Sequence, residues 1–414
     1  MPRISCLKSV AIVRTPRVKQ LEGMFDVQPS ECSEMRWEVA LPLEERDWQI
    51  GLVVGPSGCG KTTIARELFG EAMVSGFDWP HDKSIVDAFP SSMGIKDVVG
   101  LLSSVGFSSP PSWLRPFRVL SNGEQFRVTI ARALAEQPAL AVIDEFTSVV
   151  DRTVARIGSA AIARTIRRSK KRLVAVSCHY DIIDWLAPDW IYDPSANEFQ
   201  WRCLSARVER PAGPERRGPC RPPVCLEIAR VHRAAWQIFK QHHYLSRELN
   251  KSARCFVAFV VDGAEACSGR PDATPTVRAA LRPAAFTAVL HAPDALGGYW
   301  REHRTVCLPD FQGVGIGNAL SEFVAALFVA PDSQGRIKRY CSRTSHPAMI
   351  RHRANSPLWT MLGGLSFSRK HTSQYAAFNR SAALHRLTAG FRFVGQPNVK
   401  AARDLGIISS GSGP

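Results

Sequence analysis

A glycine-rich stretch with a single lysine, Gly55–Thr63, carries the best-defined chemistry in this sequence. It fits the pattern G-x-x-x-x-G-K-[ST] at every fixed position. Glycines let the backbone curl so that its N–H groups face phosphate oxygens, and the start of a following helix adds positive partial charge. Lys61 is expected to reach the β- and γ-phosphates of a nucleotide, and Thr62 to hold Mg²⁺. The predicted cofactor-binding residues are Gly55, Ser57, Gly58, Gly60, Lys61, Thr62 and Thr63.

The segments on either side of this stretch are those that such a site needs. Residues 50–54 are an apolar run that predicts a short buried strand, and residues 63–69 predict the opening of a helix. The plain alternative is a glycine-rich turn with a chance lysine, but pattern and context agree with each other. We therefore predict a nucleotide-binding domain of the α/β class.

Acidic and imidazole side chains follow two further apolar runs. Residues 139–143 predict a strand that ends at Asp144 and Glu145. Asp144 is placed to order Mg²⁺, and Glu145 is placed to polarise an attacking water. Residues 172–178 predict another strand, and His179 after it is placed to contact a γ-phosphate. Glu145 and His179 are thus predicted catalytic residues.

A turn of Ser–x–Gly type, within Leu120–Gln125, precedes an amphipathic helix predicted at 126–134. Its helix N-terminus is a second candidate for facing phosphate. Over about residues 20–202, these motifs stand in an order that resembles an ABC-type ATPase cassette. The resemblance implies ATP and Mg²⁺ as cofactors. It also implies a head-to-tail homodimer in which Lys61 of one protomer and Ser121 and Gly123 of the other enclose one ATP.

The sequence departs from that family at two places. No glutamine occurs between Thr63 and Gln125, and Asp87 stands where the family's glutamine would meet the metal. In the second motif, Asn122 and Glu124 replace glycines. The altered glutamine position and the lack of a membrane span argue against a transporter subunit, which we keep as an alternative.

Composition limits the remaining possibilities. A chain of 414 residues predicts two or three domains. No apolar run approaches the roughly 20 residues that span a bilayer, and we expect no signal peptide, because residues 1–5 do not begin the apolar stretch that one requires. Eleven cysteines without a C-x-x-C pair indicate reduced thiols, so we expect a cytoplasmic protein.

The excess positive charge of the chain lies in its second half. Residues 1–202 hold 24 Lys+Arg and 24 Asp+Glu, whereas residues 203–414 hold 29 and 13, a difference of +16. This asymmetry indicates a polyanionic partner, of which nucleic acid is the usual kind. A generically basic surface is an equally weighted alternative.

The domain boundaries follow from composition. Residues 203–223 are rich in proline and arginine and predict an exposed linker. We predict an ATP-binding domain at 1–202 and a second domain at 224–414. Residues 1–48 are expected to form edge strands, in which Phe25 and Trp37 either stack on a base or pack in a core.

The second domain has a glycine-rich turn of its own, between a strand predicted at 304–308 and a helix that runs to about Val329. Such a turn presents backbone N–H groups to an anion. The passage resembles the GCN5-related N-acetyltransferase (GNAT) family, of α+β fold, whose pyrophosphate loop reads [QR]-x-x-G-x-[GA]. The resemblance implies acetyl-CoA or another acyl-CoA, held by Leu308, Gln312, Gly313, Gly315, Gly317 and Asn318. A dinucleotide turn, which lacks its third glycine here, and an unliganded turn are the alternatives.

The acceptor side is less clearly defined. Nine of the eleven histidines lie in the second half, and His243 and Tyr244 follow its first predicted helix. An imidazole of near-neutral pKa suits the deprotonation of an amine. We predict His243 as the base, with Tyr244 and His346 as helpers; a solvated helix end is the alternative.

The sequence thus predicts an ABC-type ATPase fused to an acyl-CoA-dependent N-acyltransferase that acts on or with nucleic acid. The alternatives are an ATP-switched nucleic-acid-binding protein with an inactive GNAT fold, and the ATPase subunit of a transporter.

Overall fold

The computed structural model describes residues 3–74, 76–137, 139–202, 224–243, 248–261, 281–294, 297–367 and 387–408. The chain forms two compact units. The first comprises residues 1–77, 132–149 and 163–220, and the second comprises residues 78–131, 150–162 and 221–414. The boundaries predicted at 202 and 224 stay predictions. The linker 203–223 and Tyr244 lie outside the described residues.

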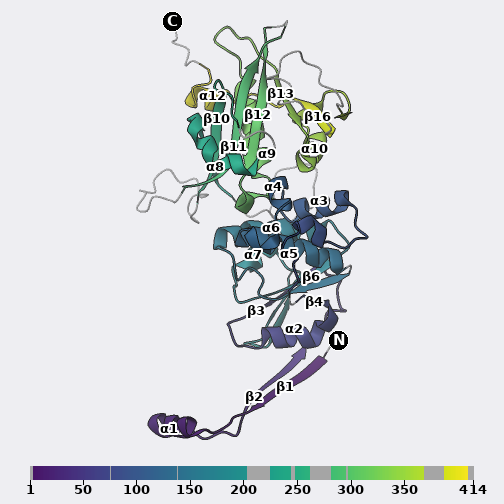
Figure 1. Ribbon diagram of the computed structural model, residues 1–414, viewed down its shortest axis with the longest axis vertical. Coiled ribbons are helices and arrows are strands. Elements are labelled where there is room, and N and C mark those ends of the chain that lie inside the picture. Colours follow the sequence, from purple (N-terminus) through teal and green to yellow (C-terminus); the bar gives the residue numbers. More distant parts are fainter. Residues whose placement is uncertain are drawn as a thin grey trace. The chain divides into compact units, whose positions relative to one another are not determined.

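The first unit is built on a six-stranded sheet of order β4-β5-β6-β3-β7-β8 (Figure 1). All pairs are parallel except β7 with β8. Every residue of β3 is buried, as expected for a parallel strand covered on both faces. The strands predicted at 50–54, 139–143 and 172–178 are confirmed. The bounds are β3 (Ile50–Val54), β4 (Met73–Val74), β5 (Leu140–Ile143), β6 (Arg172–Ser177), β7 (Trp190–Asp193) and β8 (Glu198–Trp201).

The N-terminal residues form a separate antiparallel hairpin of β1 (Arg3–Ala11) and β2 (Cys32–Ala40). Strands are present there as predicted, but they form a two-stranded sheet of their own instead of edges of the six-stranded sheet. Between them lies α1 (Pro16–Phe25), which the sequence analysis missed. It begins with Thr15 as the N-cap and proline at the first helical position, a common start signal. The other helices wholly within this unit are α2 (Lys61–Phe69), α7 (Ile182–Leu186) and η1 (Gly70–Ala72).

The second unit begins with short helices. The sequence of residues 84–87 alone suggests a further strand, and this prediction is wrong, because η2 (Ile85–Ala88) occupies this place. The Ser84 hydroxyl donates to the Asp87 carboxylate at 2.6 Å, and the Asp87 N–H donates to the Ser84 carbonyl at 3.1 Å, which closes a turn. Apolar residues near helical spacing predict a small helical insert at residues 94–118, and this is confirmed by α3 (Ile95–Ser104), α4 (Pro110–Trp113) and η3 (Phe117–Val119). Along the chain, α5 (Asn122–Glu136) and α6 (Arg152–Arg167) each begin in the second unit and end in the first.

An eight-stranded sheet makes up the body of the second unit in the described residues, in the order β14-β16-β13-β12-β11-β10-β9 with β15 beside β16 (Figure 1). Its pairs are antiparallel except β12 with β13. The bounds are β9 (Leu226–Val231), β10 (Arg254–Val261), β11 (Leu281–Ala292), β12 (Tyr299–Cys307), β13 (Tyr340–Thr344), β14 (Trp359–Met361), β15 (Ser366–Phe367) and β16 (Leu387–Phe393).

Both faces of this sheet carry apolar clusters. Phe256 and Ala258 of β10 pack with Leu320 and Val324 of α9. Alternate residues of β10 point to the other face, where Val257 packs with Trp236 and Phe286. The remaining helices are η4 (Arg233–Ala235), α8 (Trp236–Phe239), η5 (Lys240–His242), η7 (Pro309–Phe311), α9 (Ile316–Phe328), α10 (Pro347–Ala354) and α12 (Val399–Asp404).

Candidate functional site

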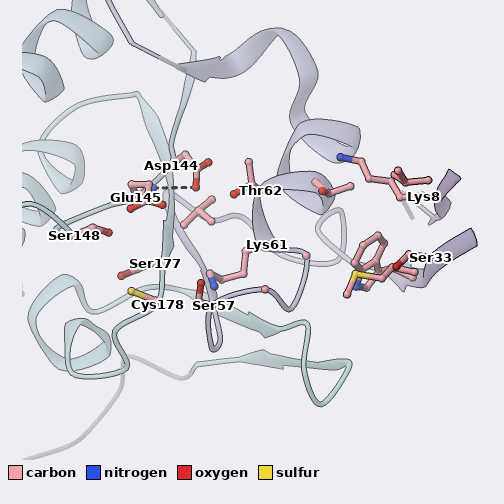
Figure 2. A pocket seen from close by; sticks show the side chains of 17 residues that line it. Lys8, Ser33, Ser57, Lys61, Thr62, Asp144, Glu145, Ser148, Ser177 and Cys178 are labelled. Atoms are coloured by element: carbon pink, nitrogen blue, oxygen red, sulfur yellow. Dashed lines mark hydrogen bonds between the residues drawn. The ribbon is translucent and has the colours of Figure 1, made fainter. Parts of the chain in front are cut away.

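A cavity of about 520 Å³ in the first unit gathers most of the predicted phosphate-binding residues (Figure 2). Its floor comes from the carboxyl ends of β3, β5 and β6, the edge at which parallel sheets bind ligands. Predicted residues lining it are Ser57, Gly58, Gly60, Lys61, Thr62, Thr63, Asp144 and Glu145. Residues that sequence analysis did not assign to the site are Lys8, Val10, Ser33, Met35, Ser148, Val176, Ser177 and Cys178.

The loop before α2 has the shape of an anion cradle. Gly58 and Gly60 have φ of 86° and 91°, values at which a side chain is strained. The Lys61 ammonium donates to the carbonyls of Gly55 at 2.9 Å and Pro56 at 2.6 Å. The N–H groups of Lys61 that now donate to these carbonyls are the ones that would donate to phosphate oxygens. The loop therefore fits a nucleotide phosphate.

The acidic pair sits in the turn after β5. The Asp144 carboxylate accepts the Glu145 N–H at 2.9 Å, and Glu145 adopts a left-handed φ of 54°. The next residue is tied to β6, because the Phe146 N–H donates to the Val176 carbonyl at 2.8 Å. Figure 2 shows Asp144 and Glu145 on one side of Lys61 and Thr62. A hydroxyl and a carboxylate in one cavity suit Mg²⁺, which prefers oxygen ligands.

The β1–β2 hairpin supplies the opposite wall, with Lys8 and Ser33 visible in Figure 2. The Trp37 indole N–H donates to the Cys59 carbonyl at 3.1 Å. A Cβ added at Gly60 would stand 2.4 Å from the Trp37 ring, so the ring lies directly on the loop. Trp37 therefore lines the cavity, whereas Phe25 is 68% exposed on α1. No spacing in residues 1–48 marks Lys8 or Ser33, since the pairing of two strands brings them there.

Five predicted residues do not line this cavity. Gly55 precedes the curled part of the loop, and the His179 N–H donates to the Ser177 hydroxyl at 3.2 Å. The other three belong to the second unit and stay predictions: Asp87, Ser121 and Gly123.

The turn before α5 explains why a glutamate replaces a glycine there. Ser121 and Glu124 form a capping box, in which the Ser121 N–H donates to the Glu124 carboxylate at 3.0 Å and the Glu124 N–H to the Ser121 hydroxyl at 3.3 Å. The same carboxylate accepts the Ser112 hydroxyl of α4 at 2.7 Å. Ser121 and Asn122 remain exposed. Glu124 thus fixes the start of α5 and leaves its tip accessible.

The glycine turn of the second unit joins η7 to α9. Gly313 and Gly315 have φ of 93° and 95°, and Gly315 is the N-cap of α9. The N-cap of α9 is a glycine and brings no capping side chain of its own, while the Gly317 N–H donates to the Cys307 side chain. A glycine turn at a helix start can offer backbone N–H groups to an anion. Gln312 is used differently from the prediction. Its amide donates to the Cys307 carbonyl at 2.8 Å and accepts the Ser108 N–H at 2.6 Å.

Helices α3 to α6 hold this turn within the second unit. Arg127 of α5 is fully buried, and its guanidinium donates to the carbonyls of Pro309 and, at 2.8 Å, Asp310. Burial lowers the pKa of Arg127, and the Asp310 carboxylate opposes that shift. A Cβ added at Gly313 would stand 2.6 Å from the Gly106 Cα. The turn and the helices are therefore packed backbone to backbone.

Strands β12 and β13 diverge beside this turn. They pair only through Trp300 with Tyr340 and Arg301 with Cys341. The Glu302 side chain there is 6% exposed, and its carboxylate accepts the Arg353 guanidinium at 2.8 Å. It also accepts the hydroxyls of Thr305 at 2.6 Å and Ser321 at 2.8 Å. Arg353 and these hydroxyls lower the pKa of Glu302 against the effect of burial.

Of the three predicted acceptor-side residues, two are described. The His243 ring is buried edge-on against Trp236, with centroids 5.7 Å apart. His346 donates from Nε2 to the Ser108 carbonyl at 3.1 Å, and burial lowers its pKa. His346 therefore helps to hold α3 and α4 against the sheet. Cys307 lies beside the turn, and burial raises the pKa of its thiol to about 12.

Comparisons with known proteins concern part of the chain. No family model matches it. The molybdenum import ATP-binding protein ModC of Rhodobacter capsulatus is 32% identical over 132 residues, which are 24% of this chain and 36% of that protein. The Fe(3+) ions import ATP-binding protein FbpC of Serratia marcescens is 28% identical over 176 residues, 33% of this chain and 51% of that protein. The chain thus spans about half or less of these relatives.

Solved structures also match. A dimeric post-hydrolysis state of the ATP-binding cassette MJ0796 with ADP and Pi is 15% identical with a TM-score of 0.32, covering 40% of this chain and 88% of that one. Sequence similarity to ModC and FbpC, together with the loop and sheet of the first unit, shows that the chain contains a P-loop cassette of the ABC type. Within the described residues, no helix is long and apolar enough to span a membrane.

Proposed function

We propose that the cassette binds ATP with Mg²⁺ and hydrolyses it. The observation that carries this proposal is the convergence of Lys61, Thr62, Asp144 and Glu145 on one cavity. The names of the relatives describe them as ATP-binding proteins, which supports the same ligand. Trp37 offers its ring at the same cavity as a surface for the base.

Each of the four residues would have a separate role in ATP hydrolysis. The Lys61 ammonium would leave the loop carbonyls and donate to phosphate oxygens, offsetting the charge that grows as the terminal P–O bond breaks. Thr62 and Asp144 would hold Mg²⁺, which neutralises phosphate charge. Glu145 would orient a water and accept its proton while the water oxygen bonds to the terminal phosphorus. ADP then leaves with the electrons of the broken bond.

The test is the ATPase rate of Glu145→Gln. Loss of a general base lowers kcat by roughly 100-fold or more, and ATP binding should persist because Lys61 is unchanged. The matched control is Glu198→Gln, an exposed position on β8 outside the cavity. Equal rates for wild type and Glu145→Gln would remove Glu145 from the mechanism.

We propose that the second unit binds an acyl-CoA and transfers its acyl group to an amine. The diverging β12 and β13, the glycine turn and the glycine N-cap of α9 support this proposal, in the order that the resemblance implies. The N–H groups from Gly313 to Asn318 would face the pyrophosphate, and the backbone at Leu308 would face the pantetheine. Gln312 would act as a brace of the turn, because its amide is already hydrogen-bonded.

In this transfer, the amine nitrogen attacks the thioester carbonyl, a C–N bond forms and the C–S bond breaks. His243 would take the proton from the amine, and the CoA thiolate leaves and is protonated. Cys307 would not form an acyl-enzyme, because a thiol with a pKa of about 12 stays protonated at neutral pH. Transfer is therefore direct.

We propose that ATP-driven movement of the cassette is transmitted to the glycine turn before α9. Arg127 lies on the helix that begins at the Ser121–Glu124 turn, and it holds the carbonyls of Pro309 and Asp310. The Asp151 carboxylate before α6 adds an ion pair to Arg282 of β11 at 3.4 Å. A shift of α5 on ATP-driven pairing would thus reach the turn directly, and coupling between two ligands is reciprocal.

Calorimetric titration with acetyl-CoA tests both the proposed acyl-CoA binding and its proposed coupling to ATP. We expect wild type to bind, with an affinity that saturating ATP changes at least about fivefold. Gly315→Glu should abolish binding by placing a carboxylate at the turn. Gly315→Ala is its matched control, since it carries the same backbone strain without the charge. No binding by wild type would reject the acyl-CoA proposal, whereas binding insensitive to ATP would reject only the coupling.

Two alternatives keep specific support. The relatives named above are import proteins, which favours the ATPase subunit of a transporter; co-purification of this chain with a membrane protein would establish it. Acetyl-CoA binding without turnover on any acceptor would favour an ATP-switched nucleic-acid-binding protein.

We place the chain in the cytoplasm, because all the cysteines in the described part are free thiols.

A further inference from the structure

A second cavity, of about 1010 Å³, opens on the second unit away from the glycine turn's own residues. One wall is the segment from the end of β9 through η4 and α8 to Lys240, and the other is the segment before β10. Its volume is at the upper end for small-molecule sites. The lining residues are His232, Arg233, Ala234, Trp236, Gln237, Lys240, Glu248, Leu249, Asn250 and Lys251.

The charge of this cavity is positive. Arg233, Lys240 and Lys251 contribute three cations, against the single carboxylate of Glu248. Lys240 donates to the side-chain oxygen of Gln237 at 2.5 Å, which positions its ammonium without neutralising it. In the part of the chain that the structure describes, none of these three cations forms a salt bridge. A concave surface with unneutralised cations focuses positive potential on an anionic ligand.

The cavity adjoins the strand that leads to the glycine turn. The Asn250 N–H donates to His303 Nε2 of β12 at 3.4 Å, and the Arg304 guanidinium donates to the Glu248 carbonyl at 3.4 Å. Lys240 begins η5, which packs against α4. The cavity therefore shares β12 with the turn and lies on the same face of the sheet as Trp236.

We propose that this cavity binds the phosphodiester backbone of a single-stranded nucleic acid. Phosphates match the unneutralised cations, and the excess of basic residues in 203–414 matches a polyanion better than a single small anion. Proteins that bind single strands do so with a positively charged groove that follows the backbone, which a concave site lined by cations resembles. The proposal rests on the proposed acyl transfer and deepens it by naming single-stranded nucleic acid as the class of acceptor and this cavity as the place that holds it.

The test is fluorescence anisotropy of labelled 20-nucleotide oligothymidylate and oligouridylate with the full chain, between 50 and 200 mM salt. Arg233→Gln combined with Lys251→Gln should weaken binding at least about tenfold at 100 mM salt. It should also lower the slope of log affinity against log salt by about 1.4, which is two contacts at about 0.7 each. ATP and acetyl-CoA are left out, so a lack of acyl transfer does not affect the result.

The matched control is Lys400→Gln with Arg403→Gln, which removes the same charge from exposed positions of α12. Ala402 of that helix packs in the cluster on the opposite face of the sheet from Trp236. The control should keep the wild-type slope, and Arg233→Lys with Lys251→Arg should keep the affinity. Equal losses in both double variants, unchanged binding by the cavity variant, or no binding by wild type would each overturn the proposal.

Discussion

His303 is a side chain whose ionisation the fold changes strongly. Burial is the largest cause, and the nearby charges of Arg304 and Arg301 and the neighbouring His243 add to it, so that the pKa falls to about 3. The neutral ring accepts the Asn250 N–H at Nε2. The structure therefore holds His303 without a proton at every pH at which the protein is expected to work.

This predicts acid sensitivity. An unfolded histidine has a pKa near 6.5, so between pH 6.5 and 3 the unfolded chain binds a proton that the folded chain does not. Stability from this group is complete above pH 6.5 and is lost as the pH falls, by about 2 kcal/mol at pH 5. Urea unfolding at pH 7 and pH 5 should show a smaller loss for His303→Gln than for wild type. The exposed His81→Gln is the control, and identical losses in all three would contradict the assignment.

The contact between the glycine turn and α3 predicts a difference between two glycines at the element scale. Gly313 and Gly315 have almost the same positive φ, so alanine at either position suffers the same backbone strain. Only at Gly313 does the new Cβ meet backbone, 2.6 Å from Gly106; at Gly315 nothing lies within 4 Å. Gly313→Ala should cost about 1–3 kcal/mol more than Gly315→Ala in thermal or urea unfolding. Equal costs would mean that the two elements are not packed together in solution.

These elements also show what the sequence could predict. Residues 50–54, 139–143 and 172–178 are continuous apolar runs, and each became a parallel strand of one sheet. The motifs at their ends therefore converged as expected for Lys61, Thr62, Asp144 and Glu145. Periodicity did not distinguish the turn at Ser84–Asp87 from a strand, because one side-chain hydrogen bond decides it.

Other features depended on contacts that no local pattern encodes. Lys8 and Ser33 reach the cavity only because β1 pairs with β2. Gln312 matched a cofactor motif, but its amide is used by Ser108, which lies 204 residues earlier. The carbonyl that accepts from the buried Arg127 guanidinium, that of Asp310, is likewise far away in the sequence. Long-range packing, rather than residue type, determined these roles.

At the scale of the whole molecule, the cassette is expected to work as a pair. Ser121 and Asn122 are exposed at the tip of α5, as a surface that meets a partner's nucleotide must be. Glu145→Gln with ATP should elute from a sizing column as a dimer, because bound ATP that is not hydrolysed keeps the two cassettes together. Glu145→Gln combined with Lys61→Ala should elute as a monomer. A monomer in both cases would exclude nucleotide-driven pairing.

The buried Arg127 has a consequence for the modularity of the chain. Its acceptors, the carbonyls of Pro309 and Asp310, lie 182 and 183 residues later in the chain. During synthesis, α5 is therefore made long before the carbonyls that accept from its guanidinium. A polypeptide cut in the linker would keep that charge and its apolar surroundings on an open surface. We expect such a fragment to need solubilising changes or a chaperone. An importer's cassette grafted in its place would likewise need a turn that accepts from its helix, so we expect the two parts of this chain not to be interchangeable with those of other proteins.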